Sequence, residues 1–237
     1  MQTHVYLLPD LIPPGCLHGS CCVVLDVLRA TTTIVTALSN GARSITPCLT
    51  IEQAQRLAQD RNVLLGGERH CLKPPEFHLG NSPAEYSAEV VRDREIAFTT
   101  TNGTKAMYAC SEAKRIVIAA FTNLSAVRSA VAEEGILNLV CSGTADEITL
   151  EDTLLAGALA ESRDPTGLND QAALAIHAWK RVTTGGSTTD HLIEHLTQSQ
   201  GGKNLQQVAK HDDIRFAAQM DQTSVVPIFN SSTHTIS

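Results

Sequence analysis

Short apolar runs alternate with helical segments through the first two thirds of this chain. Runs such as VYLL (5–8), CVVLDV (22–27) and RIVIAAF (115–121) have the composition of buried strands. Helical segments follow; for example, Thr50 can cap a helix over residues 51–60. Alternation of this kind predicts an α/β fold, with a mainly parallel or mixed sheet flanked by helices.

The length of the chain and its later pattern suggest how it is divided. From residue 150 onward the pattern is mostly helical, and 237 residues are enough for one large core, so we expect a single domain over residues 1–229. The alternative is two lobes that share a cleft and divide near residues 122–142. The polar tail, residues 230–237, is expected to be loose.

Composition excludes several classes of function. A net charge of -7 without clustered Lys and Arg argues against a nucleic-acid surface. The longest apolar runs fall short of the ~20 residues that span a bilayer, so no membrane segment is expected. The amino-terminal residues have no basic start and contain prolines, which predicts a cytoplasmic protein without a leader. The apolar helix expected at residues 170–179 could cover the core or a partner, so a homodimer is left open.

Charged and hydroxylated residues follow the strand expected at residues 22–27. Asp26 lies at the end of this run and Arg29 follows it closely, with the hydroxyls of Thr31 and Thr32 next. An acid at the carboxyl end of a strand can bind magnesium, and an arginine can bind phosphate or sulfonate oxygens through two N–H groups. The alternative is an internal ion pair followed by a threonine helix cap.

A second break follows the run NVLLGG (62–67). Glu68 and Arg69 could supply another carboxylate and another guanidinium, or could lie in a solvated loop. Further on, residues 82–85 match a capping box, so they predict a helix start. Free amides at such a start would let Asn81 and Ser82 help to hold an anion.

The third break is TTNGTKA (100–106). Asn102 and Gly103 permit a tight backbone that directs successive amides at an oxyanion, and Thr101, Thr104 and Lys105 add donors. A plain turn is the alternative.

Glu151 and Asp152 begin a later helix. They either favour the helix dipole or supply metal ligands.

Taken in order, several segments resemble the 2-phosphosulfolactate phosphatase (ComB) family. They are DVLRATTT (26–33), GGER (66–69) with FHLGNSP (77–83), TTNGT (100–104), SGT (142–144) with LED (150–152), and GGKNL (201–205) with Asp213, Ile214, Asp221 and Pro227. One departure is Glu76, at a position where the family pattern usually has glycine. The resemblance implies an α/β fold particular to this family and a magnesium-dependent hydrolase that converts (2R)-2-phospho-3-sulfolactate to (2R)-3-sulfolactate and phosphate. The alternatives are a phosphatase for another small phosphorylated hydroxy acid, and a non-catalytic module that binds a phosphorylated metabolite.

Within this reading each candidate residue has an expected role, with one Mg²⁺ and a small anionic phosphorylated substrate. The catalytic candidates are Asp26, Arg29, Glu68 and Arg69. The substrate-binding candidates are Thr31, Thr32, Asn81, Ser82, Thr101, Asn102, Gly103, Thr104 and Lys105. The metal-ligand candidates are Asp26, Glu68, Glu151 and Asp152. Attack by water on the metal and attack by a side chain such as Asp26 both stay open.

Overall fold

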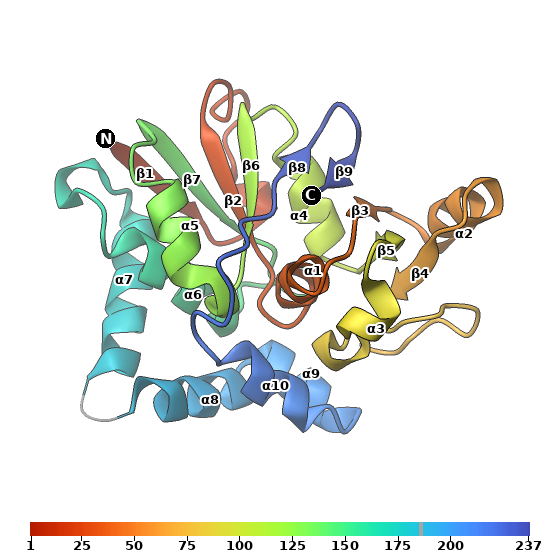
Figure 1. Cartoon of the computed structure of the whole chain (residues 1–237). Coiled ribbons are helices and arrows are strands. Elements are labelled where there is room, and N and C mark those ends of the chain that lie inside the picture. Colours follow the sequence, from red (N-terminus) through yellow and green to blue (C-terminus); the bar gives the residue numbers. More distant parts are fainter. Residues whose placement is uncertain (185–186) are drawn as a thin grey trace.

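Two β-sheets with helices between and around them make up the computed structural model, which describes residues 1–184 and 187–237 (Figure 1). The first sheet has the strand order β1-β7-β2-β6, and all of its strands are parallel. Its strands are β1 (Gln2–Tyr6), β2 (Cys21–Leu25), β6 (Arg115–Ala119) and β7 (Ile136–Cys141).

The second sheet has the order β4-β5-β3-β9-β8. Strands β4, β5 and β3 are parallel, whereas β9 runs antiparallel to both β3 and β8. Its strands are β3 (Ser44–Pro47), β4 (Leu64–Gly67), β5 (Glu95–Thr99), β8 (Phe229–Asn230) and β9 (Thr235–Ile236). The predicted α/β class with mainly parallel and mixed sheets is therefore confirmed.

Ten α-helices are described around these sheets. They are α1 (Ala30–Ser39), α2 (Ile51–Asp60), α3 (Ala88–Val91), α4 (Gly103–Ala109), α5 (Leu124–Ala130), α6 (Leu150–Ala160), α7 (Asp170–Thr183), α8 (Thr188–Gln198), α9 (Gln200–Gln207) and α10 (His211–Ala217). No helix in residues 1–184 or 187–237 is long and apolar enough to cross a membrane.

The first sheet buries both of its faces, because side chains alternate along each strand. On β2, Val23 and Leu25 belong to a core that includes α6 and α7, whereas Cys22 and Val24 belong to a second core. That second core also contains α1, α4 and the inner face of the second sheet, represented by Ile96. Helix α1 thus lies between the two sheets, and its first turn follows directly from the end of β2 (Figure 1).

The carboxyl-terminal tail is ordered, so the expectation of a loose tail is wrong. Strands β8 and β9 form a hairpin, and Ile236 pairs with Ile45 of β3 and is fully buried. Burial of one apolar side chain and pairing with a neighbouring strand hold the segment, although it is mostly polar.

The division into one domain or two lobes stays a prediction. Strands β6 and β7 lie on either side of residues 122–135 and belong to the same sheet.

Candidate active site

A cavity of about 260 Å³ lies where strand ends from both sheets come together. Residues that follow β2, β4, β5 and β7 line it, and α9 closes one side. This is the place where parallel α/β sheets commonly hold ligands. The lining residues are Asp26, Leu28, Arg29, Glu68, His70, Cys71, Asn81, Thr100, Thr101, Asn102, Thr144, Ala145, Gly201 and Asn204.

Asp26 is a buried carboxylate in the cavity wall, directly after β2. Its Oδ1 accepts a hydrogen bond from the amide of Ala30 at 3.1 Å, which fixes the carboxylate against the first turn of α1. An added Cβ at Gly103 would lie 2.6 Å from Oδ2, so any larger residue there would force Asp26 or its neighbour Ala30 to move. Burial, with the charges of Asp152 and Glu68, raises the pKa of Asp26 to about 7.

Glu68 links two of the loops that form the cavity. Its Oε1 accepts hydrogen bonds from the amide and the hydroxyl of Thr101, at 2.8 and 2.9 Å, and its Oε2 accepts one from the amide of Cys71 at 2.8 Å. The carboxylate therefore holds the loop after β4 against the loop after β5. A carboxylate oxygen has further lone pairs, so these bonds leave it able to bind a cation.

Asp152 lies behind the cavity and supports its backbone. Its Oδ1 accepts the amide of Val27 at 2.9 Å, and its Oδ2 accepts the amide of Gly143 and the hydroxyl of Ser142, both at 3.1 Å. Burial and the charge of Glu151 raise the pKa of Asp152 to about 7.

Glu151 is the other acid behind the cavity. Its Oε1 accepts the amide of Gly201 at 3.2 Å, whereas its buried Oε2 has no hydrogen-bond partner among the described residues. Burial raises the pKa of this carboxyl as well, and the nearby charge of Asp26 adds to the shift.

The four predicted metal ligands do not form one ready-made group. Among residues 1–184 and 187–237, no three His, Cys, Asp or Glu side chains are arranged to hold a metal ion. The donor set nevertheless fits Mg²⁺, which commonly takes one or two carboxylates and completes its shell with water and substrate phosphate. Asp26 and Glu68 line the cavity and qualify, whereas Glu151 and Asp152 are outside the lining.

Arg29 lines the cavity and is ion-paired, but its partner is Asp213 on α10 rather than Asp26. Its Nη1 lies 2.6 Å from Oδ2 of Asp213 on α10, and its Nη2 donates to the carbonyl of Cys71 at 2.9 Å. The guanidinium carries more N–H donors than these two bonds use, so it can still donate to a ligand.

Arg69 is not among the residues that line the cavity. Its guanidinium donates to the carbonyls of Glu68 and Leu49 and to the hydroxyl of Thr99. It braces the loop after β4.

Several hydroxyls predicted to bind substrate instead hold the scaffold. Thr31 donates to the carbonyl of Asp26, Thr32 to the carbonyl of Val27, and Thr104 contacts the hydroxyl of Thr100. A hydroxyl satisfied by a nearby backbone carbonyl is a common structural device.

The capping box predicted at residues 82–85 is absent, and so is the helix it would begin. Only a 3-10 turn forms at Pro83–Glu85. The Ser82 hydroxyl donates to Asp213 at 2.6 Å, and Glu85 accepts the amide of Gly80 at 2.7 Å. Because these side chains bind Asp213 and the amide of Gly80, they do not form the two hydrogen bonds of a capping box.

Lys105 borders a smaller cavity of about 70 Å³, which shares Asn102 with the main one. Asp10, Ser142 and Asp146 also line it. The ammonium forms no ion pair with any described residue.

Glu76 lies outside both cavities, where it accepts a hydrogen bond from Gln55 of α2 at 2.5 Å. Its side chain is exposed and contributes to neither cavity lining.

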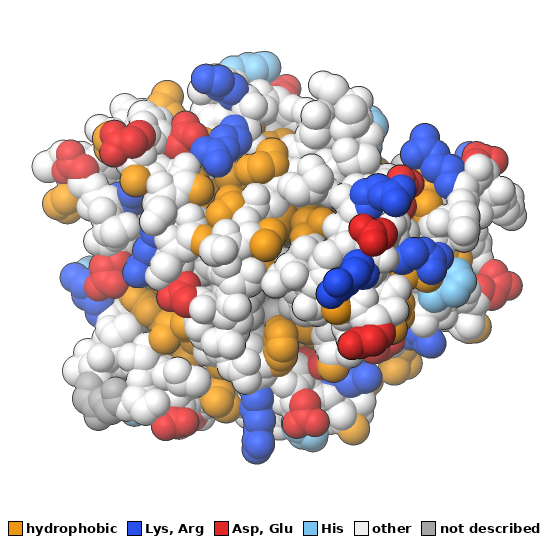
Figure 2. Space-filling view, viewed as in Figure 1, with side chains coloured by type: hydrophobic (Ala, Val, Ile, Leu, Met, Phe, Trp, Pro, Cys, Tyr) orange, Lys and Arg blue, Asp and Glu red, His pale blue; other side chains and the backbone are white. Residues whose placement is uncertain are grey.

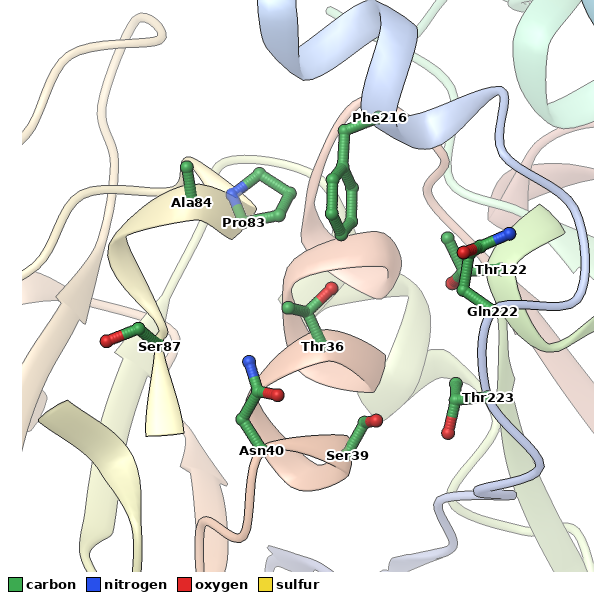
Figure 3. A pocket seen from close by; sticks show the side chains of 10 residues that line it. All are labelled: Thr36, Ser39, Asn40, Pro83, Ala84, Ser87, Thr122, Phe216, Gln222 and Thr223. Atoms are coloured by element: carbon green, nitrogen blue, oxygen red, sulfur yellow. The ribbon is translucent and has the colours of Figure 1, made fainter. Parts of the chain in front are cut away.

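A larger groove of about 340 Å³ lies elsewhere, between α1, the turn at residues 83–85 and α10 (Figure 3). Phe216 and Pro83 face each other across it, with Thr36 of α1 below. The described residues that line it are all uncharged. Phosphoryl transfer needs charged groups or a metal to stabilise the transition state, so the acidic cavity is the functional candidate.

The outer surface gives no competing candidate on the face drawn in Figure 2. Basic and acidic side chains are interspersed there, and they gather toward the side of the second sheet. No single-sign patch on this face would attract a charged macromolecule.

The structure also brings in residues to which sequence reasoning gave no role. Asp213 is the buried partner of Arg29, and Asn204 and Gly201 form the α9 wall. The sequence does contain the segment GGKNL and Asp213, which are part of the resemblance to the family. Their immediate surroundings in the sequence indicate no role in the site.

Comparison with known proteins shows which family the chain resembles. A family model described as 2-phosphosulpholactate phosphatase matches residues 6–232. A protein of Symbiobacterium thermophilum is 41% identical over 227 residues, which covers 92% of this chain and 95% of the relative. One of Thermotoga maritima is 39% identical over 220 residues, covering 92% and 93%. Both are named "Probable 2-phosphosulfolactate phosphatase".

The family model and the names of these relatives identify the class of the protein. It is a phosphoric monoester hydrolase. The chain belongs to the 2-phosphosulfolactate phosphatase family.

Proposed function

We propose that this chain hydrolyses (2R)-2-phospho-3-sulfolactate to (2R)-3-sulfolactate and orthophosphate, and that the reaction depends on Mg²⁺. The observation that carries the proposal is the pair of carboxylates, Asp26 and Glu68, in the wall of a cavity bordered by amide and hydroxyl donors. The family membership and the names of the relatives supply the substrate.

The charges of the site support the need for a cation. Asp26 and Glu68 line the cavity, Glu151 and Asp152 lie behind it, and Arg29 is already paired with Asp213. A substrate with phosphate, sulfonate and carboxylate groups would be repelled by such a wall. Mg²⁺ held by Asp26 and Glu68 would remove this repulsion and polarise the phosphoryl oxygens.

The residues of the chain would orient the substrate and the attacking water. Arg29, Asn81 and Asn102 border the cavity and can donate hydrogen bonds to phosphoryl oxygens. In the reaction a water oxygen forms a bond to phosphorus, the ester P–O bond breaks, and the proton that the water loses is taken up by the released alkoxide. Positioned donors in a water-poor site lower the barrier of such a displacement.

The first test is phosphate release from phosphosulfolactate with Mg²⁺ and with a chelator. We expect chelation to lower the rate by roughly 10²-fold or more, and added Mg²⁺ to restore it. A parallel assay with 2-phospholactate and 2-phosphoglycerate identifies the preferred ester. Equal turnover in chelator would contradict the magnesium dependence, and a strong preference for another ester would contradict the assigned substrate.

Lys105 is expected to select for the second anionic group of the substrate. Its ammonium, which pairs with no acid of the described residues, borders the small cavity that adjoins the main one at Asn102. In Lys105→Met we expect the KM for phosphosulfolactate to rise about two- to fivefold, because Lys105 is exposed and one exposed charged contact contributes about 0.5–1 kcal/mol. The KM for p-nitrophenyl phosphate, which has no sulfonate, should stay unchanged.

The matched control is Lys114→Met, at an exposed lysine that lines neither cavity. An equal rise of KM for both substrates in Lys105→Met would show that Lys105 acts on the phosphate instead.

A further inference from the structure

The ion pair between Arg29 and Asp213 is the most enclosed pair of opposite charges in the described part of the chain. Their side chains are 3% and 5% exposed, and the two atoms lie 2.6 Å apart. The second oxygen of Asp213 accepts the hydroxyl of Ser82 at 2.6 Å. Both oxygens of this carboxylate are therefore used, and both of its partners belong to segments that form the cavity.

The pair sets the position of Arg29. The residue precedes α1, and its guanidinium reaches Asp213 on α10 and the carbonyl of Cys71 in the loop after β4. Three segments that are remote in sequence thus meet at one side chain. A guanidinium held by two such bonds keeps a fixed direction toward the cavity that it lines.

The pair also sets the charge of the site. Without Asp213, the buried guanidinium would offset one of the carboxylates, Asp26 or Glu68, that line the cavity. With Asp213 in place, that offset is cancelled, so Arg29 does not reduce the negative charge of the wall. At low exposure these charges are poorly screened by solvent, so they act strongly on any ion in the cavity.

We propose that Asp213 is a positioning residue that sets the charge of the metal site by neutralising Arg29. The acids of the cavity then bind a divalent cation. The substrate anion binds only together with that cation. The inference rests on the proposed function. A structural strut between α10 and α1 would need the same contacts, but it would not affect the affinity for a cation.

The test is the affinity for Mg²⁺ without substrate, measured by titration calorimetry. In Asp213→Asn the carboxamide keeps a hydrogen-bond acceptor for Arg29 but lacks the charge. We expect the dissociation constant for Mg²⁺ to rise about tenfold or more, because a negative charge has been removed from a poorly solvated site. Orthophosphate added in chelator should bind this variant and not the wild type, since Arg29 has become a free cation.

The matched control is Asp212→Asn, the exposed neighbour on α10, which removes the same charge from the surface. Its affinity for Mg²⁺ should equal that of the wild type. Should Asp213→Asn fail to fold, the reverse change serves: Arg29→Gln leaves Asp213 charged, so its dissociation constant for Mg²⁺ is expected to fall.

Two results would overturn the inference in distinguishable ways. If the wild type binds Mg²⁺ and the folded variants at positions 29 and 213 bind it equally well, Asp213 is only a strut and the proposed function stands. If the wild type binds no Mg²⁺, the inference fails together with the magnesium dependence.

Discussion

Replacement of Asp26 with asparagine is expected to lower phosphate release by roughly 10³-fold, because the cavity loses one of the two carboxylates that line it. The amide of Ala30 can still donate to the Oδ1 of asparagine, so the first turn of α1 should keep its geometry. Phosphate release under saturating Mg²⁺ measures the effect. Turnover at the wild-type rate would remove Asp26 from the mechanism.

The same substitution should stabilise the metal-free protein at high pH. Burial raises the pKa of Asp26 to about 7, so the folded state holds this proton more tightly than the unfolded chain does. The stability from the bound proton is present below the unfolded pKa and is lost as the pH rises through about 7. In chelator at about pH 8, Asp26→Asn should therefore gain on the order of a few kcal/mol in the free energy of unfolding, and it should gain little at about pH 4.

Asp60→Asn is the control for both measurements, because Asp60 is an exposed acid at the end of α2. It should change neither the activity nor the unfolding curve. A loss of stability at high pH in Asp26→Asn would show that the carboxylate is compensated in the folded state.

Gly103→Ala is expected to lower activity by roughly 10²-fold, because displacement of a catalytic group by about 1 Å can reduce the rate by that much. An added Cβ would lie 2.6 Å from Oδ2 of Asp26 and 2.7 Å from Cβ of Ala30, so the carboxylate or the start of α1 must move. The free energy of unfolding should change less than the activity does. Alanine favours the helix by ~1 kcal/mol, and overpacking opposes it by ~1–3 kcal/mol.

Gly135→Ala provides the comparison, since an added Cβ there would meet no atom within 4 Å. It should retain full phosphate release. Full activity in Gly103→Ala would show that Asp26 has room to shift without consequence.

Local features of this fold were accessible from sequence. Thr50 caps α2 through its side chain, which accepts the amide of Gln53 at 3.1 Å, as the spacing predicts. The strand-end rule likewise selected Asp26, Glu68 and Asn102, and all three line the cavity, although Asp26 follows a strand of the first sheet and the other two follow strands of the second. These features depend on short-range geometry or on a general property of α/β sheets.

Features that depend on distant partners were not accessible. Ser82 and Glu85 fit a capping box by spacing, but their side chains form other hydrogen bonds. Ser82 donates to Asp213, and Glu85 accepts from the amide of Gly80. The hydroxyls of Thr31 and Thr32 are bound by backbone carbonyls, and a sequence does not tell whether a hydroxyl will meet a carbonyl or a ligand. The separation of the strands into two sheets is a third case, since strand order depends on packing between segments far apart in the chain.

The contact between Arg29 and Asp213 joins residues 184 positions apart, and Gln2 of β1 pairs with Ile136 of β7. Topologies dominated by such non-local contacts fold slowly, because long loops must close before the contacts stabilise them. On the ribosome, Asp26 and Glu68 emerge long before α9 and α10, which complete the cavity wall and supply the partner of Arg29. Enzymatic competence should thus be among the last properties that a nascent chain acquires.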